Sequence, residues 1–164
     1  MRPMIARLGA LAPHAMAGFI AVIFLDSLRY KFTNHPKTQV IFAALDGWTA
    51  GLGAPGLFAQ TGLLSQYVIG SIELAMAALL IVGMLRGFRH LQAGGALGGL
   101  MVMSGAVSFH LFTPLGIDPN RDGGGLFLAA CINLGFCAAL LVIRRKALGV
   151  LLSRVGGVFA PVAP

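Results

Sequence analysis

Apolar residues are grouped along the chain into long, almost unbroken runs that are separated by short polar stretches. The clearest run extends from Tyr67 to Arg86 and contains a single carboxylate, Glu73. Because a helix needs about 20 apolar residues to cross the core of a bilayer, this run predicts a membrane-spanning helix. A carboxylate inside such a helix is costly unless it has a partner or a task, so Glu73 is a candidate functional residue.

Three further runs resemble the first in length and composition. The four predicted spanning helices cover approximately residues 8–28, 67–86, 91–112 and 126–143. A long loop follows the first helix at 32–64, and its stretch 38–48 has apolar residues at helical spacing that could lie on the membrane surface. The segment 147–164 is predicted to be an interfacial or flexible apolar tail. The sequence therefore predicts an all-α, integral membrane four-helix bundle over residues 1–146.

The composition agrees with a membrane protein. Of the 164 residues, 57% are hydrophobic and 10% are charged, whereas soluble domains carry about 25% charged residues. The net charge is +7, but the basic residues stand mostly at predicted helix ends and no basic run is interleaved with aromatic residues. This distribution argues against nucleic acid as a partner.

The basic residues also predict the orientation of the bundle. Four helices place both termini on one side. That side would hold eight basic residues, namely Arg2, Arg7, Arg86, Arg89, Arg144, Arg145, Lys146 and Arg154. The opposite side would hold four, namely Arg29, Lys31, Lys37 and Arg121. The positive-inside rule then predicts cytoplasmic termini and a long first outer loop.

The third predicted helix carries two overlapping small-residue motifs. Gly94 and Gly98 form one G-x-x-x-G pair, and Gly95 and Gly99 form the other. Such glycines let a neighbouring helix backbone approach closely. They predict tight packing, either inside the bundle or between two copies of the chain.

Three polar residues are expected at the same outer depth of the bundle. Asp26 lies near the outer end of the first helix, Glu73 near that of the second and His110 near that of the third, with Arg29 and Lys31 at the rim. One interpretation is an outward-facing polar pocket that could handle a proton, a quinone headgroup or a metal ion. The alternative is an ion-pair network that only locks three helices together.

The outer loop before the last helix contains a partial ion-binding pattern. Asp118, Asn120 and Asp122 form D-x-N-x-D-G, but the glutamate that a calcium loop needs at its twelfth position is Ala129 here. The alternative is that Asp122 caps the last helix. A haem is disfavoured because His14 lies at a different depth from His110, and no metal-ligand motif is present.

The chain resembles the DoxX-like family of small four-helix bacterial membrane proteins. The resemblance rests on Arg29-Tyr30-Lys31-Phe32 followed by His35-Pro36, and on Gly70-Ser-Ile-Glu73, which is similar to the family's G-x-x-E. By this resemblance, Lys31 and Glu73 occupy the family's polar positions. Some members form the membrane subunit of a thiosulfate:quinone oxidoreductase, and others are accessory partners of thiol or oxidative-stress systems. The long first loop and the DPNRDGGG loop depart from the family pattern.

These observations lead to one functional expectation and two alternatives. The expectation is a redox-linked, quinone-associated accessory protein of the bacterial inner membrane, with no catalytic residue assigned. The first alternative is a structural subunit of a larger membrane complex or a homodimer. The second is a small transporter or proton path.

Overall fold

The computed structural model describes the backbone of residues 2–158 and the side chains of 11–154 and 156. Within that part of the chain, all regular structure is helical. The six helices are α1 (Arg2–Lys31), α2 (Pro36–Gly51), α3 (Gln66–Val82), α4 (Arg89–Phe112), α5 (Gly125–Ile143) and α6 (Arg145–Val158). The predicted all-α class therefore agrees with the structure.

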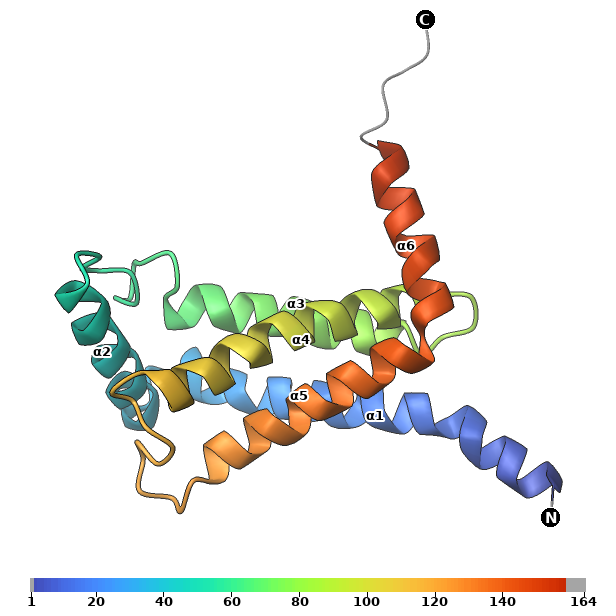
Figure 1. Ribbon diagram of the computed structural model, residues 1–164, viewed down its shortest axis with the longest axis horizontal. Coiled ribbons are helices and arrows are strands. Elements are labelled where there is room, and N and C mark those ends of the chain that lie inside the picture. The colour runs from blue at the N-terminus through green and yellow to red at the C-terminus, as the bar shows by residue number, and fades with distance from the viewer. Residues whose placement is uncertain (1, 159–164) are drawn as a thin grey trace, which may run out of the picture.

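Four of the helices run side by side along the long axis of the molecule. Helices α1, α3, α4 and α5 form this bundle, in which α1 packs on α3 and α5, and α4 packs on α3 and α5 (Figure 1). Helix α2 lies across one end of the bundle. Helix α6 stands across the other end, at which α1 begins (Figure 1).

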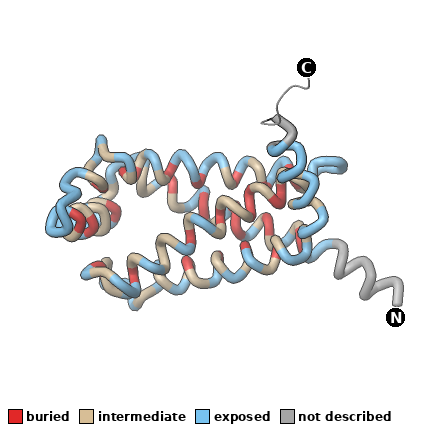
Figure 2. The backbone as a smooth tube through the Cα atoms, turned by 45° about the horizontal axis from the view of Figure 1, so that its top comes forward, coloured by how far each residue is buried: buried red, intermediate tan, exposed pale blue. Residues whose placement is uncertain are grey.

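Three of these helices are long and apolar enough to cross a membrane. The candidate spans are Leu11–Lys31, Arg89–Phe112 and Gly125–Ile143. Helix α3 is apolar but has only 17 residues, about 25 Å of helix against a hydrocarbon core of about 30 Å. The outward faces of the bundle are largely exposed (Figure 2) and carry large apolar side chains such as Val22, Met101 and Val142. Three apolar helices with lipid-compatible faces indicate a membrane protein.

Helix α3 ends four residues earlier than predicted. The run was expected to remain helical to Arg86, but α3 stops at Val82 and Gly83 is its C-cap. A Cβ atom at Gly83 would lie only 2.3 Å from the backbone nitrogen of Gln92. The chain turns at a position where α4 approaches the backbone of α3 more closely than any side chain would allow, so a glycine is needed there.

The predicted long loop at 32–64 is helical over much of its length. Helix α2 covers Pro36–Gly51, which extends the surface stretch predicted at 38–48 in both directions. Pro36 suits the first turn of a helix because its missing N–H is not needed there. The side chain of His35 caps the helix by accepting a hydrogen bond from the backbone N–H of Lys37. The first helix is also longer than predicted. It was expected over residues 8–28, and α1 covers Arg2–Lys31.

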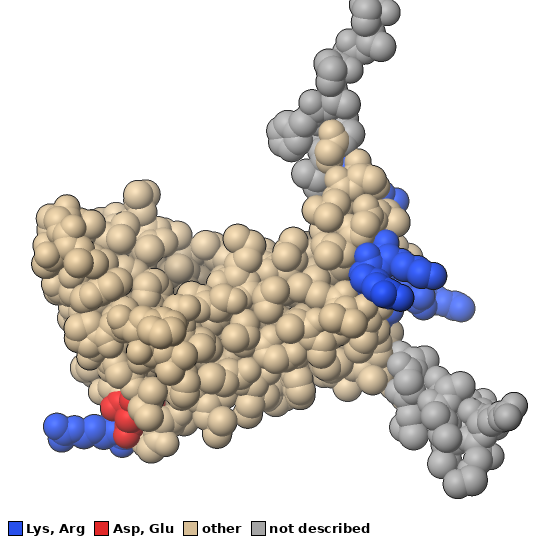
Figure 3. Space-filling model, in the orientation of Figure 1, with Lys and Arg blue, Asp and Glu red and all other residues tan. Residues whose placement is uncertain are grey.

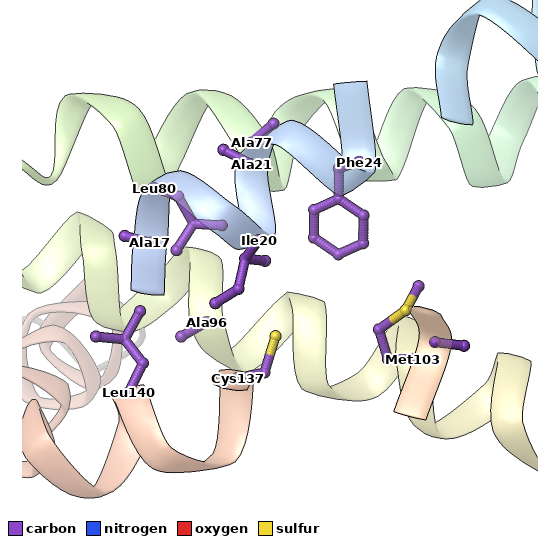
Figure 4. Close-up of a cluster of buried hydrophobic side chains, with 11 residues drawn as sticks. Ala17, Ile20, Ala21, Phe24, Ala77, Leu80, Ala96, Met103, Cys137 and Leu140 are labelled. Atoms are coloured by element: carbon purple, nitrogen blue, oxygen red, sulfur yellow. The ribbon is translucent and has the colours of Figure 1, made fainter. Parts of the chain in front are cut away.

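The bundle is held together by a core of medium and small side chains. Phe24, Ile20, Leu80 and Leu140 are almost fully buried, and alanines fill the space between them (Figure 4). In a lipid environment, burying apolar groups gains little hydrophobic energy, so close packing has to supply the stability. A second, smaller cluster of Leu45, Phe58 and Leu115 joins α2 and the loops to the end of the bundle.

The four glycines of the two motifs in α4 are covered by other helices of the same chain. A Cβ atom at Gly95 or Gly98 would press on Leu80 or Met76 of α3. At Gly99 it would press on Cys137 of α5 and Phe24 of α1, and at Gly94 it would meet Leu151 of α6. The glycines therefore serve contacts inside the bundle, which was one of the two interpretations of the motifs.

The predicted tail forms an ordered helix over most of its length. Helix α6 packs on α4, and residues 159–164 lie outside the described part of the chain. Basic side chains gather at the corner where α5 meets α6 (Figure 3). There Arg144 donates a hydrogen bond to the buried Gln92 side chain, with an Nε–Oε1 distance of 2.6 Å. Burial lowers the pKa of Arg144, and the nearby positive charge of Arg89 lowers it further.

Asn133 on α5 is an unsatisfied polar group in the core. Its side chain is fully buried, and neither amide atom has a partner in the part of the chain that the structure describes. An unpaired buried amide costs about 1–3 kcal/mol. We therefore expect Asn133→Leu, which keeps the branching of the side chain at Cγ, to raise the free energy of unfolding in detergent by about 1 kcal/mol or more.

A matched variant makes this prediction specific. Gln66 is equally buried, but its amide is fully engaged in hydrogen bonds. Gln66→Leu should therefore lower the free energy of unfolding. If Asn133→Leu is destabilising as well, the Asn133 amide contributes to stability and this interpretation of it is wrong.

Candidate functional site

A buried ion pair joins α1 to α3 at the end of the bundle that α2 covers. Lys31 is the last residue of α1, and Glu73 lies two turns into α3. The Lys31 Nζ atom is 2.7 Å from Oε2 and 2.9 Å from Oε1 of Glu73. Their side chains are only 14% and 4% exposed. Two charges are stable in such a place only if their hydrogen-bonding capacity is also met.

Ser27 meets part of that capacity. It lies one turn before Lys31, so both side chains project from the same face of α1. Its hydroxyl accepts a hydrogen bond from Lys31 Nζ at 3.1 Å. The one hydrogen of this hydroxyl has two acceptors within reach, Glu73 Oε2 and the carbonyl of Phe24. Ser27, Lys31 and Glu73 thus form one connected polar cluster.

An amide network supports the cluster. The Gln66 side chain, 1% exposed, donates to the backbone carbonyl of Lys31 at 2.7 Å and to Asn34 Oδ1. It accepts a hydrogen bond from Gln39 of α2 at 2.6 Å, and Tyr67 donates to Asn34 at 2.8 Å. These bonds fix the end of α1 against the start of α3.

Gly70 gives the lysine room to reach its partner. A Cβ atom there would lie 3.3 Å from the ring of Phe32 and 3.5 Å from Cδ of Lys31. The aliphatic stem of Lys31 therefore passes over α3 at the one position that has no side chain. This contact gives the Gly70-Ser-Ile-Glu73 motif a physical role.

A cavity of about 600 Å³ opens beside the ion pair. Its walls come from α1 to α5 and are mostly apolar and aromatic, and they include Phe42, Phe58 and Phe109. The polar and charged side chains at the cavity are Asp26, Ser27, Tyr30, Lys31, Lys37, Thr38, Glu73, His110, Asn120 and Asp122. Its size and its mostly apolar walls are typical of a small-molecule site.

The structure brings most of the predicted pocket residues to this cavity, but at different depths. Lys31, Glu73 and His110 line it and are mostly buried. Asp26 also lines it, but it is 53% exposed and pairs with Arg29 at 2.9 Å. Arg29 is not a lining residue and lies over the ring of Tyr30. His14, which was considered as a haem ligand, does not line the cavity.

His110 is held in one orientation by its backbone environment. Its Nδ1 atom is 2.6 Å from the carbonyl oxygen of Gly116, and its ring packs edge-on against Phe127. Because a carbonyl oxygen can only accept a hydrogen bond, the Nδ1 atom carries the proton. In the neutral imidazole, the lone pair is then on Nε2.

The loop before α5 is organised by its two aspartates. Asp118 Oδ1 accepts the backbone N–H of Asp122 at 2.8 Å, and Asp122 Oδ1 accepts that of Gly125, the first residue of α5, at 3.0 Å. The first of these bonds lowers the pKa of Asp118. Asp122 therefore contacts the first backbone N–H of α5, although the N-cap residue itself is Gly124. Among the described residues, no three His, Cys, Asp or Glu side chains are grouped as metal ligands.

Sequence reasoning missed two members of the site. Ser27 could have been found from its four-residue spacing to Lys31, which places both side chains on one face of a helix. No local sequence pattern points to Gln66, because its hydrogen-bond partners lie in three different segments of the chain.

The arrangement can hold a lipophilic molecule that has a polar head. Apolar and aromatic walls would surround its body, and the buried polar groups would orient its head. Comparison of the chain with family models, curated proteins and solved structures finds no match.

Proposed function

We propose that this protein is a multi-pass protein of the bacterial inner membrane, of the DoxX-like type, and that its cavity binds a quinone. The observation that carries the proposal is the combination of a cavity of about 600 Å³, aromatic walls and three mostly buried polar side chains that line it, Lys31, Glu73 and His110. A quinone has a flat apolar ring with two polar oxygens, which suits such a site. The protein would then act as an accessory that holds the quinone for a redox partner.

The membrane orientation is part of this proposal. Helices α1, α3, α4 and α5 would span the bilayer, with both termini in the cytoplasm and α2 outside. All five acidic residues belong to the end that α2 covers, namely Asp26, Asp46, Glu73, Asp118 and Asp122. Basic residues dominate the other end, which the positive-inside rule assigns to the cytoplasm.

The cysteines favour an accessory role over a thiol oxidoreductase. Cys131 and Cys137 are both free and both lie on α5. Six residues apart on one helix, they point in different directions and cannot form a disulfide with each other.

The single tryptophan offers a direct test of quinone binding. Trp48 of α2 packs against the cavity residue Phe109, with ring centroids 6.4 Å apart. We expect a short-chain ubiquinone to quench Trp48 fluorescence saturably in the detergent-purified protein. Ala129→Phe, which fills the cavity from α5, should remove the saturable component.

A matched variant separates the cavity from the detergent. Ala138 lies on the same helix but is exposed and does not line the cavity. In Ala138→Phe, the quinone should therefore quench Trp48 fluorescence saturably, as in the unmodified protein. Quenching that increases linearly with quinone in all three proteins would mean that the quinone enters the micelle and not the cavity, and the proposed function would be wrong.

A further inference from the structure

We infer that the cavity selects the reduced, hydroxyl-bearing form of its ligand, a quinol, over the oxidised quinone. This inference rests on the proposed function and adds to it a preference between two redox forms. It follows from counting which polar groups at the cavity still have hydrogen-bonding capacity after the internal contacts are made.

The buried donor at the cavity is already occupied. A lysine ammonium has three N–H groups. Those of Lys31 have three acceptors within reach, namely both carboxylate oxygens of Glu73 and the hydroxyl of Ser27. Lys31 therefore has no hydrogen left to offer to a ligand carbonyl.

The buried groups that retain capacity are acceptors. Glu73 Oε2 receives hydrogen bonds from both Lys31 and Ser27, whereas Oε1 receives one, from Lys31. His110 uses its Nδ1–H on Gly116, which leaves the Nε2 lone pair without a donor among the described residues. Both acceptors belong to residues that line the cavity and are, as whole residues, 3% and 5% exposed.

Other donors stand nearer to the rim of the cavity. Lys37 is exposed and solvated, and the Tyr30 hydroxyl, which accepts a hydrogen bond from Arg29, keeps its own hydrogen to donate. The hydroxyls of Tyr30 and Thr38 and the amide of Asn120 can each donate or accept, so they do not distinguish the two forms. The difference between the forms is therefore set by Glu73 and His110.

These two acceptors fit a quinol better than a quinone. The hydroxyl groups of a quinol can donate to a carboxylate oxygen and to an imidazole nitrogen. The carbonyl groups of a quinone would face those same acceptors with lone pairs and leave them unpaired. Because an unpaired buried acceptor is costly, we expect the quinol to bind at least about tenfold more tightly.

The test is an anaerobic competition in detergent at neutral pH, with Trp48 fluorescence as the readout. A short-chain ubiquinone is bound first, and its quinol or the dimethyl ether of that quinol is then added. The quinol should displace the quinone at about one tenth of its concentration or less. The dimethyl ether keeps the shape but has no O–H group, so it should displace poorly.

Two variants connect the preference to the named atoms. Glu73→Gln supplies an amide donor and releases Lys31, so it should shift the preference toward the quinone. His110→Phe removes one acceptor without changing an ion pair, so it should reduce the quinol preference. This variant also keeps the preference testable if Glu73→Gln fails to fold. Ala138→Phe should leave the preference unchanged.

The outcomes distinguish this inference from the proposed function. If the quinone binds saturably but at least as tightly as the quinol, the inference is wrong and the proposed function stands. If neither form binds, the proposed function fails and the inference fails with it. A quinol preference that survives both Glu73→Gln and His110→Phe would also overturn the inference.

Discussion

Replacing Lys31 with methionine is expected to lower the free energy of unfolding by about 3–5 kcal/mol. The change keeps the aliphatic stem that passes over Gly70 but leaves the carboxylate of Glu73, which is 4% exposed, without its counter-charge. An uncompensated buried charge is far more costly than the loss of the pair itself. The measurement is denaturant unfolding of the purified protein in a mild detergent.

Two further variants separate this effect from a general loss of charge. The double variant Lys31→Met with Glu73→Leu removes both charges, so it should recover most of the lost stability. Arg29→Met breaks an exposed pair two residues away and should cost less than about 1 kcal/mol. If Lys31→Met costs no more than Arg29→Met, the pair does not behave as a buried one.

Gly95→Ala is expected to lower the free energy of unfolding by about 1–3 kcal/mol. A Cβ atom at this position would lie 2.8 Å from Cγ of Leu80, 2.9 Å from the carbonyl oxygen of Met76 and 3.0 Å from the nitrogen of Leu80. Two of these atoms belong to the backbone of α3, which cannot move aside as a side chain can. Helices α3 and α4 must therefore separate to accept a single methyl group.

A second glycine gives the control for Gly95→Ala. A Cβ atom at Gly135 of α5 would meet nothing within 4 Å. Because alanine favours helix more than glycine does by up to about 1 kcal/mol, Gly135→Ala should be neutral or stabilising. Thermal unfolding of the two variants in the same detergent is the measurement. The unfolding temperature should fall for Gly95→Ala, and it should rise or stay the same for Gly135→Ala.

The apolar runs allowed the bundle helices to be predicted, but not where every helix ends. The end of α3 depends on the approach of Gln92 to Gly83, a contact between two helices that no local pattern reports. Helix α2 has a visible start in His35-Pro36. Its sequence fits a surface helix as well as a loop, and its packing on Phe58 and Leu115 decides between them.

The sequence allowed us to predict at which end of the bundle the site lies, but not which basic residue pairs with Glu73. Successive antiparallel helices bring Asp26, Glu73 and His110 to one end, as the topology argument expected. The partner of Glu73 depends on how α1 is rotated about its own axis. Arg29 and Lys31 are two residues apart, so they point away from each other and only one can reach α3. The structure places Lys31 inside with Ser27, and Arg29 outside with Asp26.

The most direct test of the central claim is to locate a bound quinone on the chain. A photoreactive quinone would be added to the protein in native membranes, activated by light, and its position would then be found by peptide mapping. We expect labelling of cavity residues such as Phe58, Phe109 and Ala129, and loss of the label when an excess of unreactive quinone is present. Labelling confined to the lipid-facing side chains, or label that unreactive quinone does not displace, would contradict the claim.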